Sequence, residues 1–204
     1  MIRSGEFPAG KRLRQVDIAE RFDVSTTPVR EAFTSLAREG LVTQDAHRGV
    51  VVFVPSRDDL LQNYEIRMAL EPLAARIAAT NATADDLGRL TPLLEEMRKA
   101  LINDTARYGG PLNSRFHAAI YAAARRPRLA ELIQQLRDAS LAYVQLLSAQ
   151  PQPLEYLEGA HAEHEEILAA LRARAPRRAA DAMTRHLVHN QHQILAALQH
   201  GASA

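Results

Sequence analysis

The sequence predicts a mainly α-helical protein in which an N-terminal winged helix-turn-helix precedes a C-terminal all-α bundle of six helices. Residues 14–54 change quickly from helical spacing of apolar residues to two short β-rich runs, whereas helix follows helix from Arg57 onward. Pro55–Ser56 is the only plausible linker between these two patterns. We therefore expect a winged domain, residues 1–55, and a helical domain, residues 56–204.

The N-terminal elements occur in the order helix, turn, helix, hairpin. RQVDIAERF places its apolar residues on one helical stripe, and DVS is a short polar turn. TTPVREAFTSLAREG begins with hydroxyl capping candidates, has Pro28 in its first turn and ends at Gly40, which suits a left-handed C-terminal cap. LVTQD and VVVFVP then predict two strands around AHRG. This order is that of a winged helix-turn-helix.

Six helices are predicted in the second domain, because helical patterns alternate there with recognisable breaks. The breaks are TNAT, in which Thr83 can cap the next helix ahead of Asp85 and Asp86, and the segments GGP, RRP, QPQP and RAP. The expected helices span about residues 58–80, 84–102, 108–124, 127–149, 154–174 and 177–199.

Composition restricts the classes of function. The formal net charge is only +1, so DNA binding must be argued from the placement of basic residues rather than from their total. No apolar run approaches the roughly 18 residues of a membrane span, and no signal peptide is visible. The absence of cysteine agrees with a reducing compartment and leaves any metal to His, carboxylate or amide ligands. We expect a cytoplasmic protein that does not bind membranes.

Motifs in both domains resemble one known family. TTPVREAFTSLAREGLV, preceded by FPAGKRL and followed by RGVVV, resembles the DNA-binding domain of GntR-family transcription regulators, where the usual pattern is S-R-T-P-V-R-E-A-L. YEIRMALEPLAARIAA, RFHAAI, EHEEILAAL and AMTRHL resemble the FCD ligand-binding domain of the FadR subfamily, and six helices make the chain similar to the VanR-like subgroup. The resemblance implies a homodimer that binds a pseudo-palindromic double-stranded DNA operator, with repression relieved by a small organic acid.

Two departures from the family pattern have consequences. Thr26 stands where the family usually has arginine, so we expect weaker DNA binding or an altered base preference. The family also has a first helix before I-x-x-G-x-x-x-P-G, whereas only MIRSGEFPAG remains here. We expect either a truncated start or a winged domain that lacks a packing helix.

The start of the second helix carries the DNA contacts that we predict. In a helix-turn-helix, this part of the second helix meets base edges and phosphates in the major groove. Arg30 can present a bidentate fork to guanine, worth roughly 1–3 kcal/mol of discrimination. Ser25, Thr26 and Thr27 are short donors at a helix N-terminus, where phosphate is favoured. The alternative is that these hydroxyls only cap a core helix while Arg30 pairs with a nearby acid; the wing and the spacing favour DNA binding.

The resemblance implies further DNA contacts outside this helix. Lys11, which we expect at the start of the preceding helix, occupies the position of a family base-reading arginine. Gly49, at the tip of the wing, lets the backbone enter the minor groove, with His47 and Arg48 beside it.

The helical domain holds seven of the eight histidines. Asn113 and His117 are four residues apart and share one helix face, while His164 and His186 lie on two further helices beside inward-facing apolar residues. Three imidazoles and one amide oxygen can converge on a divalent cation such as Zn, Ni or Mn. The resemblance supports this set, because metal-binding FCD domains use an aspartate and three histidines at matching positions. Asn113 replaces that aspartate, so we expect a lower metal affinity.

Other polar residues of the helical domain are weaker candidates. Arg67 could hold a carboxylate effector through a bidentate contact, and an ion pair with Glu71 is an equally weighted alternative. Tyr64, Arg115 and Tyr143 are further candidates for the effector pocket. We expect His161 at the surface rather than next to a metal ligand, and His189 and His192 off the face of His186.

Rival functions leave more of the sequence unexplained. A di-iron bundle enzyme needs two Glu-x-x-His motifs, and only Glu158 and His161 have that spacing; no His-Glu-x-x-His occurs. We therefore do not expect an enzyme. An architectural DNA-binding protein would have no use for the helical domain. A regulator whose histidines contact a ligand directly, without metal, stays open.

Overall fold

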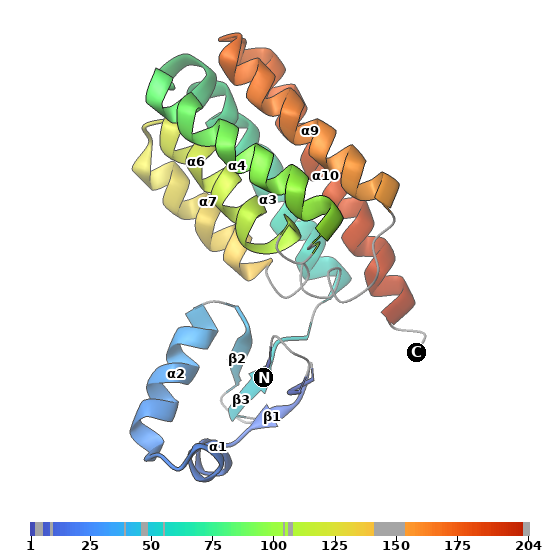
Figure 1. Cartoon of the computed structure of the whole chain (residues 1–204). Coiled ribbons are helices and arrows are strands. Elements are labelled where there is room, and N and C mark those ends of the chain that lie inside the picture. Colours follow the sequence, from blue (N-terminus) through green and yellow to red (C-terminus); the bar gives the residue numbers. More distant parts are fainter. Residues whose placement is uncertain are drawn as a thin grey trace.

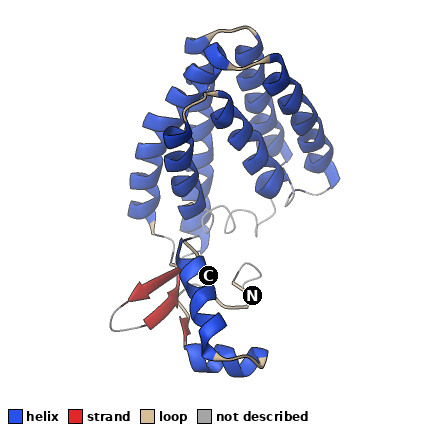
Figure 2. Ribbon diagram, turned by 90° about the vertical axis from the view of Figure 1, so that its left-hand side faces the viewer, coloured by secondary structure: helices blue, strands red, loops and turns tan. Residues whose placement is uncertain are grey.

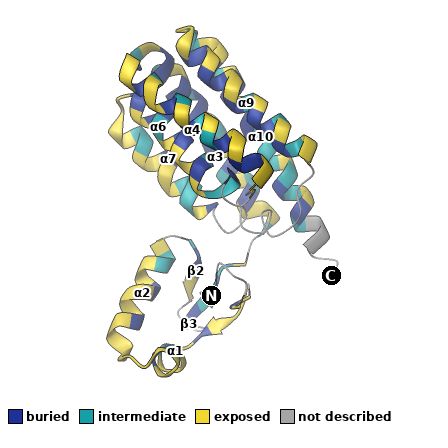
Figure 3. Cartoon of the chain, in the orientation of Figure 1, coloured by how far each residue is buried: buried dark blue, intermediate teal, exposed yellow. Residues whose placement is uncertain are grey.

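The computed structural model consists of a small winged domain and a bundle of helices, so the predicted fold class is confirmed (Figures 1 and 2). Buried residues line the inward faces of the bundle helices, whereas much of α1 and α2 is exposed (Figure 3). The structure describes residues 1–2, 6–8, 10–38, 40–45, 49–54, 56–103, 105, 108–140 and 154–201.

The winged domain consists of two helices and a three-stranded sheet. Strand β3 is the central strand and pairs antiparallel with both β1 and β2, in the order β1-β3-β2. Strand β1 is therefore an edge strand. The predicted two helices and hairpin are all present, and β1 is an additional strand. The elements are β1 (Arg12–Leu13), α1 (Gln15–Phe22), α2 (Thr26–Arg38), β2 (Val42–Asp45) and β3 (Gly49–Val52).

Lys11 does not begin a helix, and this expectation was wrong. Its carbonyl oxygen accepts a hydrogen bond from the backbone N–H of Val52 at 2.9 Å, and the N–H of Gly10 donates to the carbonyl oxygen of Val52 at 3.0 Å. These bonds draw the segment around Lys11 onto β3, so that α1 begins only at Gln15. The residue nevertheless stays in the winged domain.

Left-handed backbone conformations occur at Gly40 and Gly49 of the winged domain, and the sequence predicts the one at Gly40. Gly40 has a left-handed φ of +70°, and the N–H groups of Gly40 and Leu41 bond back to the end of α2. Gly49, at the start of β3, has a φ of +75°. The core of this domain is formed by Phe7, Leu13, Ala19, Val29, Phe33, Val42, Val50 and Val52.

The bundle contains one helix for each of the six predicted ones. α3 packs against α6, α7, α9 and α10 and therefore forms its centre. A π-helical turn, η1 (Tyr108–Leu112), precedes α6, and the last part of the predicted helix 127–149, residues 141–149, lies outside the described residues. The helices are α3 (Arg57–Asn81), α4 (Ala84–Asn103), α6 (Asn113–Ala123), α7 (Pro127–Ala139), α9 (Leu154–Arg172) and α10 (Pro176–Gly201).

Thr83 caps α4, as its sequence context predicts. The hydroxyl of Thr83 accepts from the N–H of Asp86 at 3.2 Å, and the carboxylate of Asp86 accepts from the N–H of Thr83 at 2.9 Å. This reciprocal pair satisfies two backbone donors that a helix start otherwise leaves without partners.

Among the described residues, no helix has both the length and the apolar character that a membrane span requires. β3 ends at Val52 and α3 begins at Arg57, while the domain boundary at residue 55 stays a prediction.

Candidate metal centre

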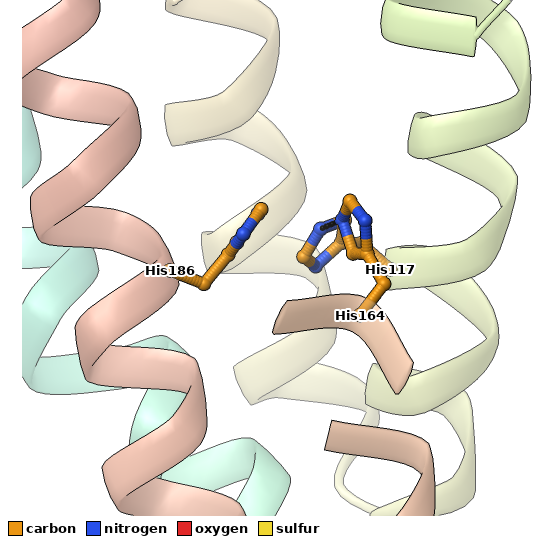
Figure 4. A group of neighbouring side chains, drawn as sticks. All are labelled: His117, His164 and His186. Carbon is orange, nitrogen blue, oxygen red and sulfur yellow. Dashed lines mark hydrogen bonds between the residues drawn. The ribbon is translucent and has the colours of Figure 1, made fainter. Parts of the chain in front are cut away.

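Three histidines from three helices converge inside the bundle (Figure 4). His117 lies on α6, His164 on α9 and His186 on α10, with relative exposures of 0%, 1% and 4%. One nitrogen of each ring lies within 4.8 Å of those of the other two, and Nε2 of His117 is 3.2 Å from Nε2 of His164. The sequence therefore identified three residues that the fold brings together.

Buried apolar residues surround these histidines on each helix. Phe116 and Ile120 flank His117 and are fully buried, and the ring of Phe116 packs edge-on against His164 with centroids 5.2 Å apart. On α9 and α10 the apolar residues next to the histidine or one helical turn from it are also buried: Ile167, Leu168, Met183 and Leu187.

The outer nitrogen of His117 is held by a buried chain of polar groups. Nδ1 of His117 lies 3.1 Å from the hydroxyl of Tyr121, and that hydroxyl donates a short hydrogen bond to Oε2 of Glu71. Oε1 of Glu71 accepts from Nε of Arg67 at 2.6 Å, and a guanidinium nitrogen of Arg137 lies 3.5 Å from Oε2. Because Tyr121 uses its proton toward Glu71, its oxygen is free to accept from Nδ1–H of His117.

The outer nitrogens of the other two rings also have partners. Nδ1 of His164 lies 3.5 Å from the hydroxyl of Tyr108, a residue of η1 whose ring packs edge-on against the imidazole. Nδ1 of His186 lies 2.9 Å from Oε2 of Glu163. With Nδ1 engaged outside the cluster in all three rings, Nε2 is the nitrogen left for its centre.

Burial keeps two of the rings neutral. Loss of hydration lowers the pKa of His117 well below its ordinary value of 6.5, and the positive charge of Arg137 lowers it further. Burial also lowers the pKa of His164, with the neighbouring His186 acting in the same direction. Neutral imidazole is the form that binds a metal ion, so these two rings are ready to do so at neutral pH.

Asn113 supplies an acceptor without a partner. Its Oδ1 is buried and has no hydrogen-bond partner among the described residues, although burying such an oxygen unpaired is unfavourable. Asn113 stands one helical turn before His117, on the same face of α6. Three imidazoles and one unpaired amide oxygen are a donor set that fits a divalent transition-metal ion.

One further histidine differs from the expectation, and another contacts the site indirectly. His161 is buried, not at the surface, since its ring packs near Tyr108 at a centroid distance of 6.1 Å. Its nearest described acid is Glu165, 3.7 Å from Nε2. Nδ1 of His189 lies 2.9 Å from the second oxygen of Glu163, so His189 is linked to the three-histidine cluster through that carboxylate.

The residues predicted for an effector pocket have different surroundings. Arg67 forms the buried ion pair with Glu71 that was the alternative, and its guanidinium lies 4.4 Å from the ring centroid of Tyr64. The hydroxyl of Tyr64 is buried and has no hydrogen-bond partner in the described part of the chain. Arg115 is exposed and pairs with Glu96 of α4 at 3.7 Å, rather than facing the histidines. Tyr143 lies outside the described residues.

Arg137 and Glu163 were missed by the sequence analysis. Arg137 follows the buried Ile133 by one helical turn and precedes Ser140 by another, a spacing that could have placed it on the inner face of α7. Glu163 stands in the run AEHEE, where acids usually face water, and no pattern marks it.

The predicted DNA-contacting end of α2 is open to solvent. Ser25, Thr26, Thr27 and Arg30 are all exposed. No acid of the described residues pairs with Arg30, which disfavours the alternative of a local ion pair. His47 and Arg48 lie outside the described residues.

Two families of known proteins match the chain. Residues 1–52 match the family described as "Bacterial regulatory proteins, gntR family", and residues 62–189 match the FCD domain. The second match alone covers more than half of the chain.

Individual relatives are regulators rather than enzymes. The chain is 32% identical over 139 residues to the uncharacterized HTH-type transcriptional regulator YdhC of Bacillus subtilis, covering 68% of this chain and 62% of YdhC. It is 29% identical over 188 residues to the HTH-type transcriptional repressor RspR of Escherichia coli, covering 87% and 77%. The solved structure of E. coli McbR/YncC has a TM-score of 0.80 at 27% identity and covers 98% of this chain and 92% of that one.

Proposed function

Because the chain belongs to the gntR family of bacterial transcriptional regulators and carries an FCD domain, we propose that it is a repressor controlled by a small carboxylate that binds at a metal ion in the histidine cluster. The observation that carries this proposal is the arrangement of His117, His164 and His186, whose outer nitrogens are all engaged while the inner ones face one another. Repression is the stated activity of the relative RspR.

The winged domain would act on DNA as half of a symmetric dimer. A dimer presents two copies of α2 to a pseudo-palindromic operator, with the helix start in the major groove. Ser25, Thr26 and Thr27 would contact phosphates, and Arg30 would read a base edge. Their exposure at one helix end supports these roles. Lys11, Gly49, His47 and Arg48 are proposed as supporting contacts.

The close approach of two imidazoles supports a cation at the cluster. If Nδ1 of His117 and of His164 each carries the ring proton, two lone pairs on Nε2 face one another at 3.2 Å, which is unfavourable. Zinc–nitrogen bonds of about 2.0–2.1 Å in a tetrahedral site place neighbouring nitrogens roughly 3.3 Å apart. The 3.2 Å separation thus matches one edge of such a site. With the three imidazoles in three positions of such a site, the fourth would be left for an effector carboxylate or for Oδ1 of Asn113.

The charges around Glu71 favour an anionic effector. Two guanidinium groups, those of Arg67 and Arg137, approach the single carboxylate of Glu71. The two guanidinium groups and the one carboxylate together carry a net charge of +1. Tyr121 links this charged group to His117 by hydrogen bonds. A carboxylate that reaches both the metal ion and this excess charge would neutralise it. Arg67 and Tyr64 remain candidates for such contacts, and their part in binding is a proposal.

Helix α7 is suited to transmit the state of the site. It carries Arg137 next to Glu71, and its last residue, Ala139, lies against Gly40 at the end of α2. An effector that binds better to one arrangement of α7 would shift the population of winged-domain positions and hence the operator affinity.

The proposal is tested by metal content and DNA binding of purified protein. Wild type should retain about one divalent ion per chain, and one of a panel of small carboxylates should weaken operator binding measured by fluorescence anisotropy. His164→Ala should lose both the ion and the response while still binding the operator. His192→Ala, an exposed histidine on α10, is the matched control. If wild type responds to a carboxylate but retains no metal, the metal part of the proposal is wrong and the effector binds in a metal-free pocket.

A further inference from the structure

One carboxylate in the bundle contacts two imidazoles at once. Oε2 of Glu163 lies 2.9 Å from Nδ1 of His186, and Oε1 lies 2.9 Å from Nδ1 of His189. We propose that Glu163 is a positioning residue that fixes the orientation and tautomer of His186, so that its Nε2 is presented to a divalent metal ion. This inference rests on the proposed function, in which His186 is a ligand.

The hydrogen-bonding capacity of a carboxylate determines the tautomer. An ionised carboxylate only accepts hydrogen bonds, so each Nδ1 in contact with Glu163 must carry a proton. A neutral imidazole with a proton on Nδ1 has its lone pair on Nε2. For His186, Nε2 is then the nitrogen available to the cluster formed with His117 and His164. A carboxylate behind a ligand imidazole also makes that ligand more basic.

Glu163 differs from the outer partners of the other two rings. Tyr121 and Tyr108 contact His117 and His164 through hydroxyls, which can either donate or accept, so each favours a tautomer only through the second bond that its hydroxyl makes. Among the described residues, Glu163 is the carboxylate in direct contact with the three-histidine cluster. Replacing Glu163 should therefore affect the orientation of His186 more than that of His117 or His164.

His189 holds Glu163 from the outer side. The ring of Tyr156 packs at right angles against His189, with centroids 5.1 Å apart, and so restricts where His189 can lie. The side chain of His189 is 32% exposed, whereas the side chain of His186 is 5% exposed, so the carboxylate spans from the interior to the edge of the bundle. Because both oxygens are bound, Glu163 has little freedom to turn away from His186.

Glu163→Gln is the direct test, because glutamine has nearly the same shape but no charge. Its amide oxygen can accept from one Nδ1–H, while its NH2 group faces the other ring as a donor. We expect the affinity for Zn²⁺, measured by competition with a chromophoric chelator, to fall about 10- to 100-fold. Glu163→Asp keeps an anionic acceptor and should retain more affinity than Glu163→Gln. Glu166→Gln, exposed on the same helix and paired with Arg185, should leave the affinity unchanged.

A second readout does not depend on metal. Long-range ¹H–¹⁵N NMR spectra of the imidazoles in metal-free protein should show the Nδ1–H tautomer for His186 in wild type and a changed tautomer population in Glu163→Gln. Zn²⁺ affinity of Glu163→Gln within twofold of wild type, or an Nε2–H tautomer of His186 in wild type, would overturn the inference. If wild type binds no Zn²⁺, the proposed function fails, and the NMR spectra still decide whether Glu163 fixes the ring.

Discussion

Gly40, which follows the recognition helix α2, lies against Ala139 at the end of α7. A methyl carbon on Gly40 would sit 3.1 Å from Cα of Ala139, closer than nine in ten such contacts, and φ at Gly40 is +70°. The neighbouring atoms belong to backbone and cannot turn aside as a side chain can. This contact joins the two domains at the point where α7 also carries Arg137, next to the buried Glu71.

Gly40→Ala should therefore disturb both stability and regulation. A left-handed conformation costs a residue with a side chain roughly 1–2 kcal/mol, so we expect the free energy of unfolding to fall by about that amount. Crowding against α7 should also change the operator affinity in the absence of effector. Thermal unfolding and anisotropy titrations measure these effects. Gly88→Ala is the control, because, apart from the backbone of α4 itself, no atom of the described residues lies within 4 Å of the added carbon; it should be neutral or stabilising.

Arg30→Ala should abolish specific operator binding while the protein stays folded. Loss of a bidentate contact to guanine removes roughly 1–3 kcal/mol of discrimination at each half-site. Arg98→Ala, an exposed substitution on α4, should bind as wild type. If a DNA footprint of Arg30→Ala shows the same sequence preference as wild type, Arg30 does not read a base.

Thr26→Arg should strengthen DNA binding. Thr26 is the first residue of α2 and is exposed, and an arginine there can reach a phosphate. The plot of log affinity against log salt should become steeper by roughly one phosphate contact per half-site. Equal slopes for wild type and Thr26→Arg would mean that this position does not face DNA.

Asp86 should make the bundle sensitive to acid. Burial by itself raises the pKa of Asp86, but hydrogen bonds from Thr83 and the contact with Arg125 outweigh it, and the net effect is a lowered pKa. A lowered pKa in the folded state stabilises the fold above the unfolded value of 3.8, and this contribution is lost as the pH falls through the folded value. Asp86→Asn should cost about 0.5–2 kcal/mol at neutral pH and flatten the pH dependence below about pH 4. The exposed Asp85→Asn is the control in urea unfolding at several pH values.

The elements that could be predicted from the sequence have strong local patterns. The six helices and the convergence of His117, His164 and His186 follow from apolar neighbours at helical spacing, which decide which face turns inward. β1 has only two residues and becomes a strand through backbone bonds to β3, so periodicity cannot reveal it. Glu163 looks like any solvated acid of α9 until α10 packs beside it, because its partners are 23 and 26 residues away.

Asn113→Asp tests whether the amide oxygen belongs to the metal site. Without a cation, a carboxylate at this buried position lacks a described partner, as Oδ1 of Asn113 does now, and should lower the melting temperature of metal-free protein. With a cation, the charged oxygen is a better ligand than the amide, so metal affinity should rise and the melting temperature should increase more on metal addition than in wild type.

The control for this prediction is Asn103→Asp, which adds the same charge at an exposed position on α4, where the amide bonds only to a carbonyl of its own helix. It should change neither melting temperature by more than a surface substitution does. If the oxygen is a ligand, Asn113→Asp must melt below wild type without metal and gain more than wild type when metal is added, because the charge that destabilises the metal-free site is the one that holds the ion. A shift of the same size in both forms would place Asn113 beside the histidines without a part in binding metal.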